Sequence, residues 1–186
     1  MRILAILFAA LLLASCGMTG KAPAPVASGA VSGVAATPAP GAGTLRPYPQ
    51  TDEFLQCVPF ARTVSGVEIY GDAWTWWNQA EGRYRRGREP RIGAVLALRQ
   101  TGRLRLGHVA VVVARVDERR LLVSHANWGG DSRTRGKIHT RQPVMDVSPA
   151  NDWSQLRFMN TQGTFGSIYP AHGFIYPELT VADLGR

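Results

Sequence analysis

Three segments after Pro90 carry the alternating, branched apolar pattern of β-strands and follow one another closely. The segments are GAVLALR at residues 93–99, HVAVVVARV at 108–116 and LLVSHANW at 121–128. The turn-forming pairs Thr101-Gly102 and Asp117-Glu118 separate them. Connections this short join antiparallel strands, because a parallel crossover needs about a dozen residues or more. The chain is therefore constrained to fold around an antiparallel sheet.

Other elements are expected on both sides of these strands. A helix is predicted from Val58 to Thr63, ending near Ser65-Gly66, because Pro59 suits a first helical turn. A second helix, AWTWWNQAE at residues 73–81, is predicted with Asp72 as its cap. Further strands are predicted at residues 138–140, 144–147, 155–159 and 173–176.

The first 15 residues have the pattern of a signal peptide. Arg2 precedes an apolar run of about a dozen residues, which is too short to span a bilayer that needs roughly 20. Leu13-Ala14-Ser15-Cys16 resembles the lipobox of bacterial lipoproteins, in which the cysteine is acylated and becomes the mature N-terminus. The resemblance implies an exported bacterial lipoprotein, held to membrane lipid through Cys16 and facing the periplasm or cell wall. Ordinary cleavage nearby is the alternative.

The composition divides the rest of the chain into a tether and a working domain. Residues 16–49 are almost entirely Ala, Gly, Pro, Ser, Thr and Val, which predicts a disordered tether with a reach of about 30 Å. Residues 50–186 contain all five tryptophans. This length of about 135 residues suits one compact, monomeric domain.

Cys57 is the only thiol left if Cys16 carries lipid, since the chain has two cysteines. An unpaired cysteine in an exported protein indicates a reactive nucleophile or intermolecular pairing, and a buried structural thiol is the alternative. Cys57 stands at the N-terminus of the helix predicted from Val58. The helix dipole and free amides there lower a thiol's pKa from about 8.5, so a thiolate is expected.

Two histidines and an asparagine are the expected partners of this thiol. In the segment LLVSHANW, alternation places His125 and Asn127 on one face with Leu121 and Val123. His108 opens the preceding strand, so a meander brings it beside them. Zinc bound by Cys57, His108 and His125 is a rival interpretation, but no CxxC or HExxH pattern accompanies them.

An ordered set of short motifs resembles the CHAP domain, the cysteine, histidine-dependent amidohydrolase/peptidase family of NlpC-like papain-fold hydrolases. The motifs are Gln56-Cys57, Gly71-Asp72-Ala73-Trp74, Gly93-Ala94-Val95, Gly107-His108-Val109-Ala110-Val111-Val112 and His125-Ala126-Asn127-Trp128. The resemblance implies a papain-like α+β fold, with N-terminal helices packed on an antiparallel sheet of about five to six strands.

The resemblance also implies roles for these residues. Cys57 matches the nucleophile and His108 the general base. Many CHAP domains have a glutamate where His125 stands, whereas Asn127 keeps the family's asparagine, so either residue could orient His108. The Cys57 amide, with Gln56, is expected to hold the oxyanion, and Trp128 to lie near the substrate. Packing alone is the alternative for Gln56. No metal or cofactor is expected.

These residues predict a cell-wall hydrolase that cleaves a peptidoglycan amide through an acyl-enzyme. The scissile bond would lie in the stem peptide, or at the N-acetylmuramoyl-L-alanine junction. The alternative is a catalytically inactive, lipid-anchored module that binds peptidoglycan or regulates other hydrolases. The net charge of +8 suits a carboxylate-bearing wall. Nucleic acid is not an expected partner, because no aromatic-basic binding motif is present.

Overall fold

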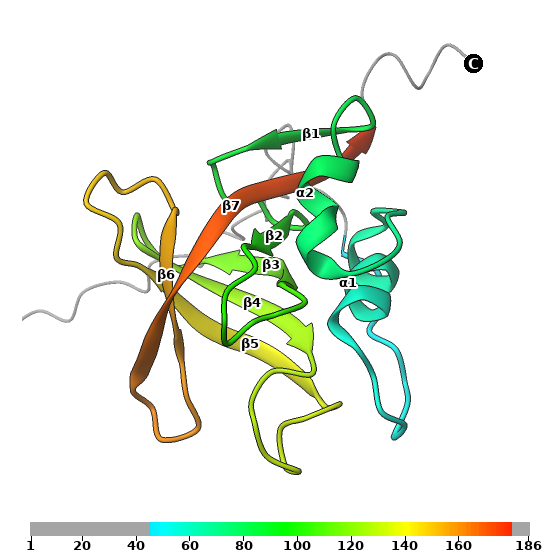
Figure 1. Cartoon of the computed structure of the whole chain (residues 1–186), viewed down its shortest axis with the longest axis vertical. Helices are drawn as coiled ribbons and strands as arrows, with labels where there is room; N and C mark the ends of the chain where they lie inside the picture. The colour runs from blue at the N-terminus through cyan, green and yellow to red at the C-terminus, as the bar shows by residue number, and fades with distance from the viewer. Residues whose placement is uncertain (1–44, 180–186) are drawn as a thin grey trace, which may run out of the picture. The chain divides into compact units, whose positions relative to one another are not determined.

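The computed structural model describes residues 45–179. The expected signal peptide, Cys16 and most of the expected tether lie outside these residues. The elements in chain order are α1 (Cys57–Ser65), η1 (Ala73–Thr75), α2 (Trp76–Gln79), β1 (Tyr84–Gly87), β2 (Val95–Leu98), β3 (His108–Arg115), β4 (Arg120–Ala126), β5 (Ile138–Asp146), β6 (Gln155–Met159) and β7 (Phe165–Leu179), as labelled in Figure 1.

The strands form one antiparallel sheet that closes on itself. Its order is β1-β7-β2-β3-β4-β5-β6, and β6 also pairs with β7. The long strand β7 makes this closure, because residues 165–170 pair with β6 while residues 171–175 pair with β2. Strands β2 to β7 therefore form a six-stranded, barrel-like ring, and β1 lies outside it against the far end of β7 (Figure 1).

The expected fold is met in part. The antiparallel sheet is present, with seven strands and not five to six, but the molecule is mostly β with few helices, and the papain-like α+β arrangement of N-terminal helices is not confirmed. The helix predicted at residues 73–81 is replaced by the short η1 and α2, and Asp72 stands at the cap position without a side-chain capping bond. Two predicted strands merge into β5 across Pro143. Strand β1 was not predicted, because its sequence YRRG is polar and lacks apolar alternation.

Helix α1 begins one residue before the predicted Val58 and ends at Ser65, where the sequence indicates. Pro59 lies in its first turn, and Gly66 closes it in a left-handed conformation with φ 78°, donating its N–H to the Arg62 carbonyl. Phe60, Ala61 and Val64 are buried, and the helix contacts β3 and β4. This packing fixes Cys57, the first residue of α1, close to the sheet.

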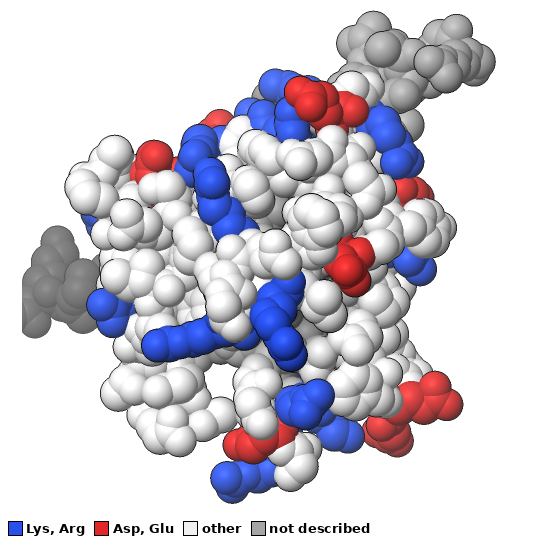
Figure 2. Space-filling model, in the orientation of Figure 1, with Lys and Arg blue, Asp and Glu red and all other residues white. Residues whose placement is uncertain are grey.

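The surface is basic, as the composition indicates. In Figure 2, Lys and Arg side chains cross the middle of the visible face with few Asp and Glu side chains between them. Within residues 45–179, no helix has the length and hydrophobicity needed to cross a membrane.

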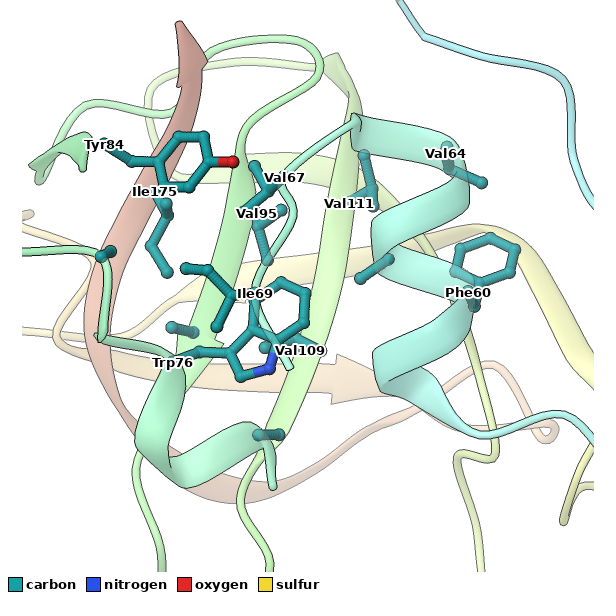
Figure 3. Close-up of a cluster of buried hydrophobic side chains, with 14 of the residues drawn as sticks. Phe60, Val64, Val67, Ile69, Trp76, Tyr84, Val95, Val109, Val111 and Ile175 are labelled. Carbon is teal, nitrogen blue, oxygen red and sulfur yellow. The ribbon is translucent and has the colours of Figure 1, made fainter. Parts of the chain in front are cut away.

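The central strands are buried on both faces and separate two apolar clusters. One cluster lies between the central strands and the helices (Figure 3). Its strand residues are Val95, Ala97, Val109 and Val111, and they pack with Phe60, Val64 and Trp76. The second cluster fills the inside of the ring. It contains the alternate residues of β2 and β3, with others from β4 and β6: Leu96, Leu98, Ala110, Val112, Leu121, Val123, Leu156 and Phe158. By the same alternation His108 belongs to the inner face, at the end of β3 nearest α1.

Candidate active site

Cys57 and His108 line one cavity of about 490 Å³. The thiol is partly buried, so it is open to a ligand and not sealed in the core. The same cavity is lined by Gln56 and Asn127 and by the loop that joins β2 to β3. The structure therefore brings together the expected nucleophile and the expected base.

Burial raises the pKa of the Cys57 thiol. Backbone N–H groups of Val109, Val58 and Cys57 itself act in the opposite direction, because they favour the thiolate. Removal of the sulfur from water outweighs them. The expectation that the helix dipole and free amides lower this pKa is therefore wrong, and the resting group is a thiol.

His108, His125 and Gln142 form a chain of hydrogen bonds that runs into the ring. His108 Nε2 lies 2.8 Å from His125 Nδ1, and His125 Nε2 lies 2.5 Å from Gln142 Oε1. Gln142 Nε2 in turn donates to the Met159 carbonyl at 2.6 Å. The other ring nitrogen of His108, Nδ1, has no hydrogen-bond partner within residues 45–179.

Both imidazoles are neutral at neutral pH. Burial, and then the positive charge that His125 and His139 can carry, hold the pKa of His108 well below its ordinary value. Burial lowers the pKa of His125 to about 3, against a smaller upward effect of its bond to Gln142. His108 and His125 are 3% and 0% exposed, so water does not solvate the charged forms.

Asn127 lies just beyond the regular strand, so the alternation that places it on the face of His125 ends before it. Strand β4 ends at Ala126, and Asn127 has a left-handed backbone with φ 58°, which breaks the alternation. Its Nδ2 donates to Gln56 Oε1 at 2.6 Å, and its Oδ1 accepts from the Gly136 N–H at 2.9 Å. Asn127 therefore holds Gln56, whereas His125 contacts His108.

Gln56 is oriented by this contact. Because its Oε1 faces Asn127, its Nε2 is the end available to a ligand, and Gln56 lines the cavity directly before Cys57.

Trp128 packs over the two histidines. Its ring centroid lies 4.7 Å from that of His108 and 5.4 Å from that of His125, and it also contacts Phe158 and Tyr169. Trp128 lines a second cavity, with His139 and Gln142, and not the cavity of Cys57. The structure therefore places Trp128, which is expected near the substrate, at this second cavity.

The sequence interpretation missed Gln142, Arg103 and Arg105. Gln142 belongs to no motif, and only the pairing of β4 with β5 brings it to His125. Arg103 and Arg105 line the Cys57 cavity from the β2–β3 loop. Their RLRLG sequence, just before His108, is a signal that could have indicated them.

The residues of this site bear on metal binding and on similarity to known proteins. No group of three or more His, Cys, Asp or Glu side chains in residues 45–179 could hold a metal ion. No curated protein matches the chain. The family model of the CHAP domain matches residues 47–127, a segment that includes Cys57, His108 and His125. The chain therefore carries a CHAP domain across residues 47–127.

Proposed function

We propose that this protein hydrolyses an amide bond of peptidoglycan through Cys57. A CHAP domain implies a hydrolase of the peptidoglycan type. The observation that carries the specific proposal is the cavity that Cys57 and His108 share, in which His108 Nδ1 has no hydrogen-bond partner in the described residues. Thiol acyl transfer needs a base with a free lone pair that can reach the thiol, and the shared cavity provides both groups.

The reaction begins with a neutral thiol and a neutral imidazole. His108 Nδ1 takes the Cys57 proton while the sulfur attacks the carbonyl carbon, and the backbone N–H of Cys57 and the Gln56 Nε2 donate to the oxyanion. The carbon–nitrogen bond then breaks, and His108 gives its proton to the leaving amine. Water attacks the thioester with His108 as base, the carbon–sulfur bond breaks, and the proton returns to Cys57.

The charges of the cavity support a carboxylate-bearing substrate. Its charged lining residues are Asp72, Arg103 and Arg105. Arg103 also lines a neighbouring cavity, where its Nη1 donates to the Ser167 hydroxyl, so Arg105 is the arginine that the Cys57 cavity does not share with this second one. Arginine binds carboxylates with paired N–H donors. We therefore place the scissile bond near a free carboxylate, as in the stem peptide.

The location of the enzyme is part of the proposal. The signal-peptide pattern of residues 1–15 and the lipobox around Cys16 support an exported, membrane-anchored protein. Such an anchor would hold the catalytic domain next to the cell wall, where the substrate is found.

Digestion of purified sacculi tests this function. The full chain is expected to release soluble fragments with new amino groups, whereas Cys57→Ala is expected to release them at least on the order of 10³-fold more slowly. Mass spectrometry of the fragments identifies the bond, because a stem-peptide cut and a cut at the sugar junction leave different termini. If both forms sediment with sacculi and neither releases amines, the protein is a binding module and the proposal is wrong.

A further inference from the structure

We propose that Gln142 is a positioning residue that fixes the tautomers of His125 and, through it, of His108. Its catalytic consequence rests on the proposed function, whereas the tautomers themselves do not. The inference follows from the direction of three consecutive hydrogen bonds that join β3, β4, β5 and β6.

The orientation of the Gln142 amide is set at its far end. The Met159 carbonyl can only accept a hydrogen bond, so the group 2.6 Å from it must be the NH₂ of Gln142. The amide oxygen, Oε1, then has to face His125 Nε2, at 2.5 Å. Met159 is the last residue of β6, so a neighbouring strand holds the amide in place.

The protons of the two rings follow from this orientation. An amide oxygen cannot donate, so His125 Nε2 carries the hydrogen. A neutral imidazole has one N–H, which leaves His125 Nδ1 as an acceptor for His108 Nε2 at 2.8 Å. His108 therefore carries its hydrogen on Nε2, and Nδ1 keeps the lone pair that the Cys57 proton requires.

A bulge in the β4–β5 pairing makes the contact possible. Val123 pairs with Gln142 and His125 pairs with His139, so β5 has one more residue than β4 between these pairs. The irregular segment includes Arg141, which has a left-handed φ of 52° and donates its N–H to the Ser124 hydroxyl. In a regular strand, residues three apart point to opposite faces. Because of the bulge, His139 and Gln142 point to the same face of the sheet.

Loss of the Gln142 acceptor would release the tautomers. If the hydrogen of His125 moved to Nδ1, His108 Nε2 would have to accept, and its own hydrogen would move to Nδ1. His108 would then present an N–H, and not a lone pair, to the thiol. A wrong tautomer of the base prevents proton removal even where the ring stays in place.

The test replaces Gln142 with a side chain of similar size that cannot accept. In Gln142→Met, kcat on sacculus fragments is expected to fall about 10- to 100-fold with little change in KM, as is usual when a group that orients a histidine is lost. Gln142→Glu should keep more of the activity, because a protonated carboxyl can accept from His125 and donate to Met159. Gln162→Met makes the same change at an exposed turn and is the matched control.

Nitrogen-15 NMR of the histidine rings supplies a readout that does not depend on turnover. The wild-type protein should show His108 and His125 protonated at Nε2 only, and Gln142→Met should show both tautomers. A wild-type spectrum with Nδ1–H on either ring overturns the proposal, as do unchanged tautomers in Gln142→Met. If wild type hydrolyses nothing, the proposed function fails while the spectra still decide the role of Gln142. If Gln142→Met does not fold, the wild-type tautomers decide alone.

Discussion

Burial keeps both reacting groups uncharged, although it moves their pKa values in opposite directions. The pKa of Cys57 is raised and that of His108 is lowered, so the resting pair is a thiol and an imidazole. A thiolate–imidazolium pair would need the two shifts to be reversed. Proton transfer to His108 therefore has to accompany attack by the sulfur, and activity depends on His108 remaining unprotonated.

This protonation state predicts the pH dependence of hydrolysis. Because the pKa of His108 lies well below 6.5, its neutral form persists as the pH falls through 6.5. The acid limb of the kcat/KM profile is therefore expected below pH 6.5. Below the pKa of His108, kcat/KM should fall about 10-fold for each pH unit. Rates measured between pH 4 and pH 8 on a soluble sacculus fragment check this. An acid limb at or above pH 6.5 would contradict the neutral pair.

The loop between β2 and β3 is the element that positions the site. It precedes His108, carries Arg103 and Arg105, and is tied to η1 by a 3.0 Å bond from the Trp74 N–H to the Leu106 carbonyl. Gly107 makes this close approach possible. It has φ 66°, and a Cβ added there would lie 2.6 Å from the Trp74 nitrogen.

Substitution of this glycine tests the role of the loop. Gly107→Ala is expected to lower the free energy of unfolding by about 2 kcal/mol or more, since left-handed strain adds to a backbone clash. Hydrolysis should fall with it, because the start of β3 has to shift. Gly102→Ala in the same loop is the control, as nothing lies within 4 Å of its added Cβ. Equal urea midpoints for the two variants would rule out the close contact as a constraint.

At the scale of the whole molecule, closure of the sheet buries ionisable side chains among the apolar side chains inside the ring. His125 is 0% exposed and stacks on Phe158, with ring centroids 5.8 Å apart. The folded protein therefore holds His125 neutral down to a pKa of about 3, whereas the unfolded chain takes up a proton near pH 6.5. Stability gained from the neutral ring is present above pH 6.5 and is lost on acidification.

Acid sensitivity of folding is the resulting expectation. Between pH 6.5 and about 3 the unfolded state binds more protons, so the free energy of unfolding should decrease by up to roughly 1.4 kcal/mol per pH unit for each such histidine. Urea denaturation at pH 7 and pH 4.5 measures this slope. A His125→Gln variant should lose less unfolding free energy between these two pH values than the wild-type protein does. If the variant and the wild-type protein lose the same unfolding free energy, His125 is protonated in the folded protein.

The sequence by itself determined the local parts of this protein. Alternation in residues 93–128 predicted the central antiparallel strands, Pro59 and Gly66 marked α1, and the spaced motifs indicated the CHAP domain and the approach of Cys57 to His108. These features depend on residues close in the chain, where backbone geometry and side-chain period are sufficient. A polar strand such as β1 carries no such period, and it was missed.

Only the tertiary structure decided how the strands close and which side chain joins His108. Closure depends on β7 pairing with β6 and β2 at once, and no local pattern specifies distant partners. The left-handed residue Asn127 and the bulge at Arg141 override the two-residue period on which a sequence interpretation relies. Burial then reversed the expected shift of the Cys57 pKa, because the depth of the thiol is set by packing and not by its place at the start of a helix.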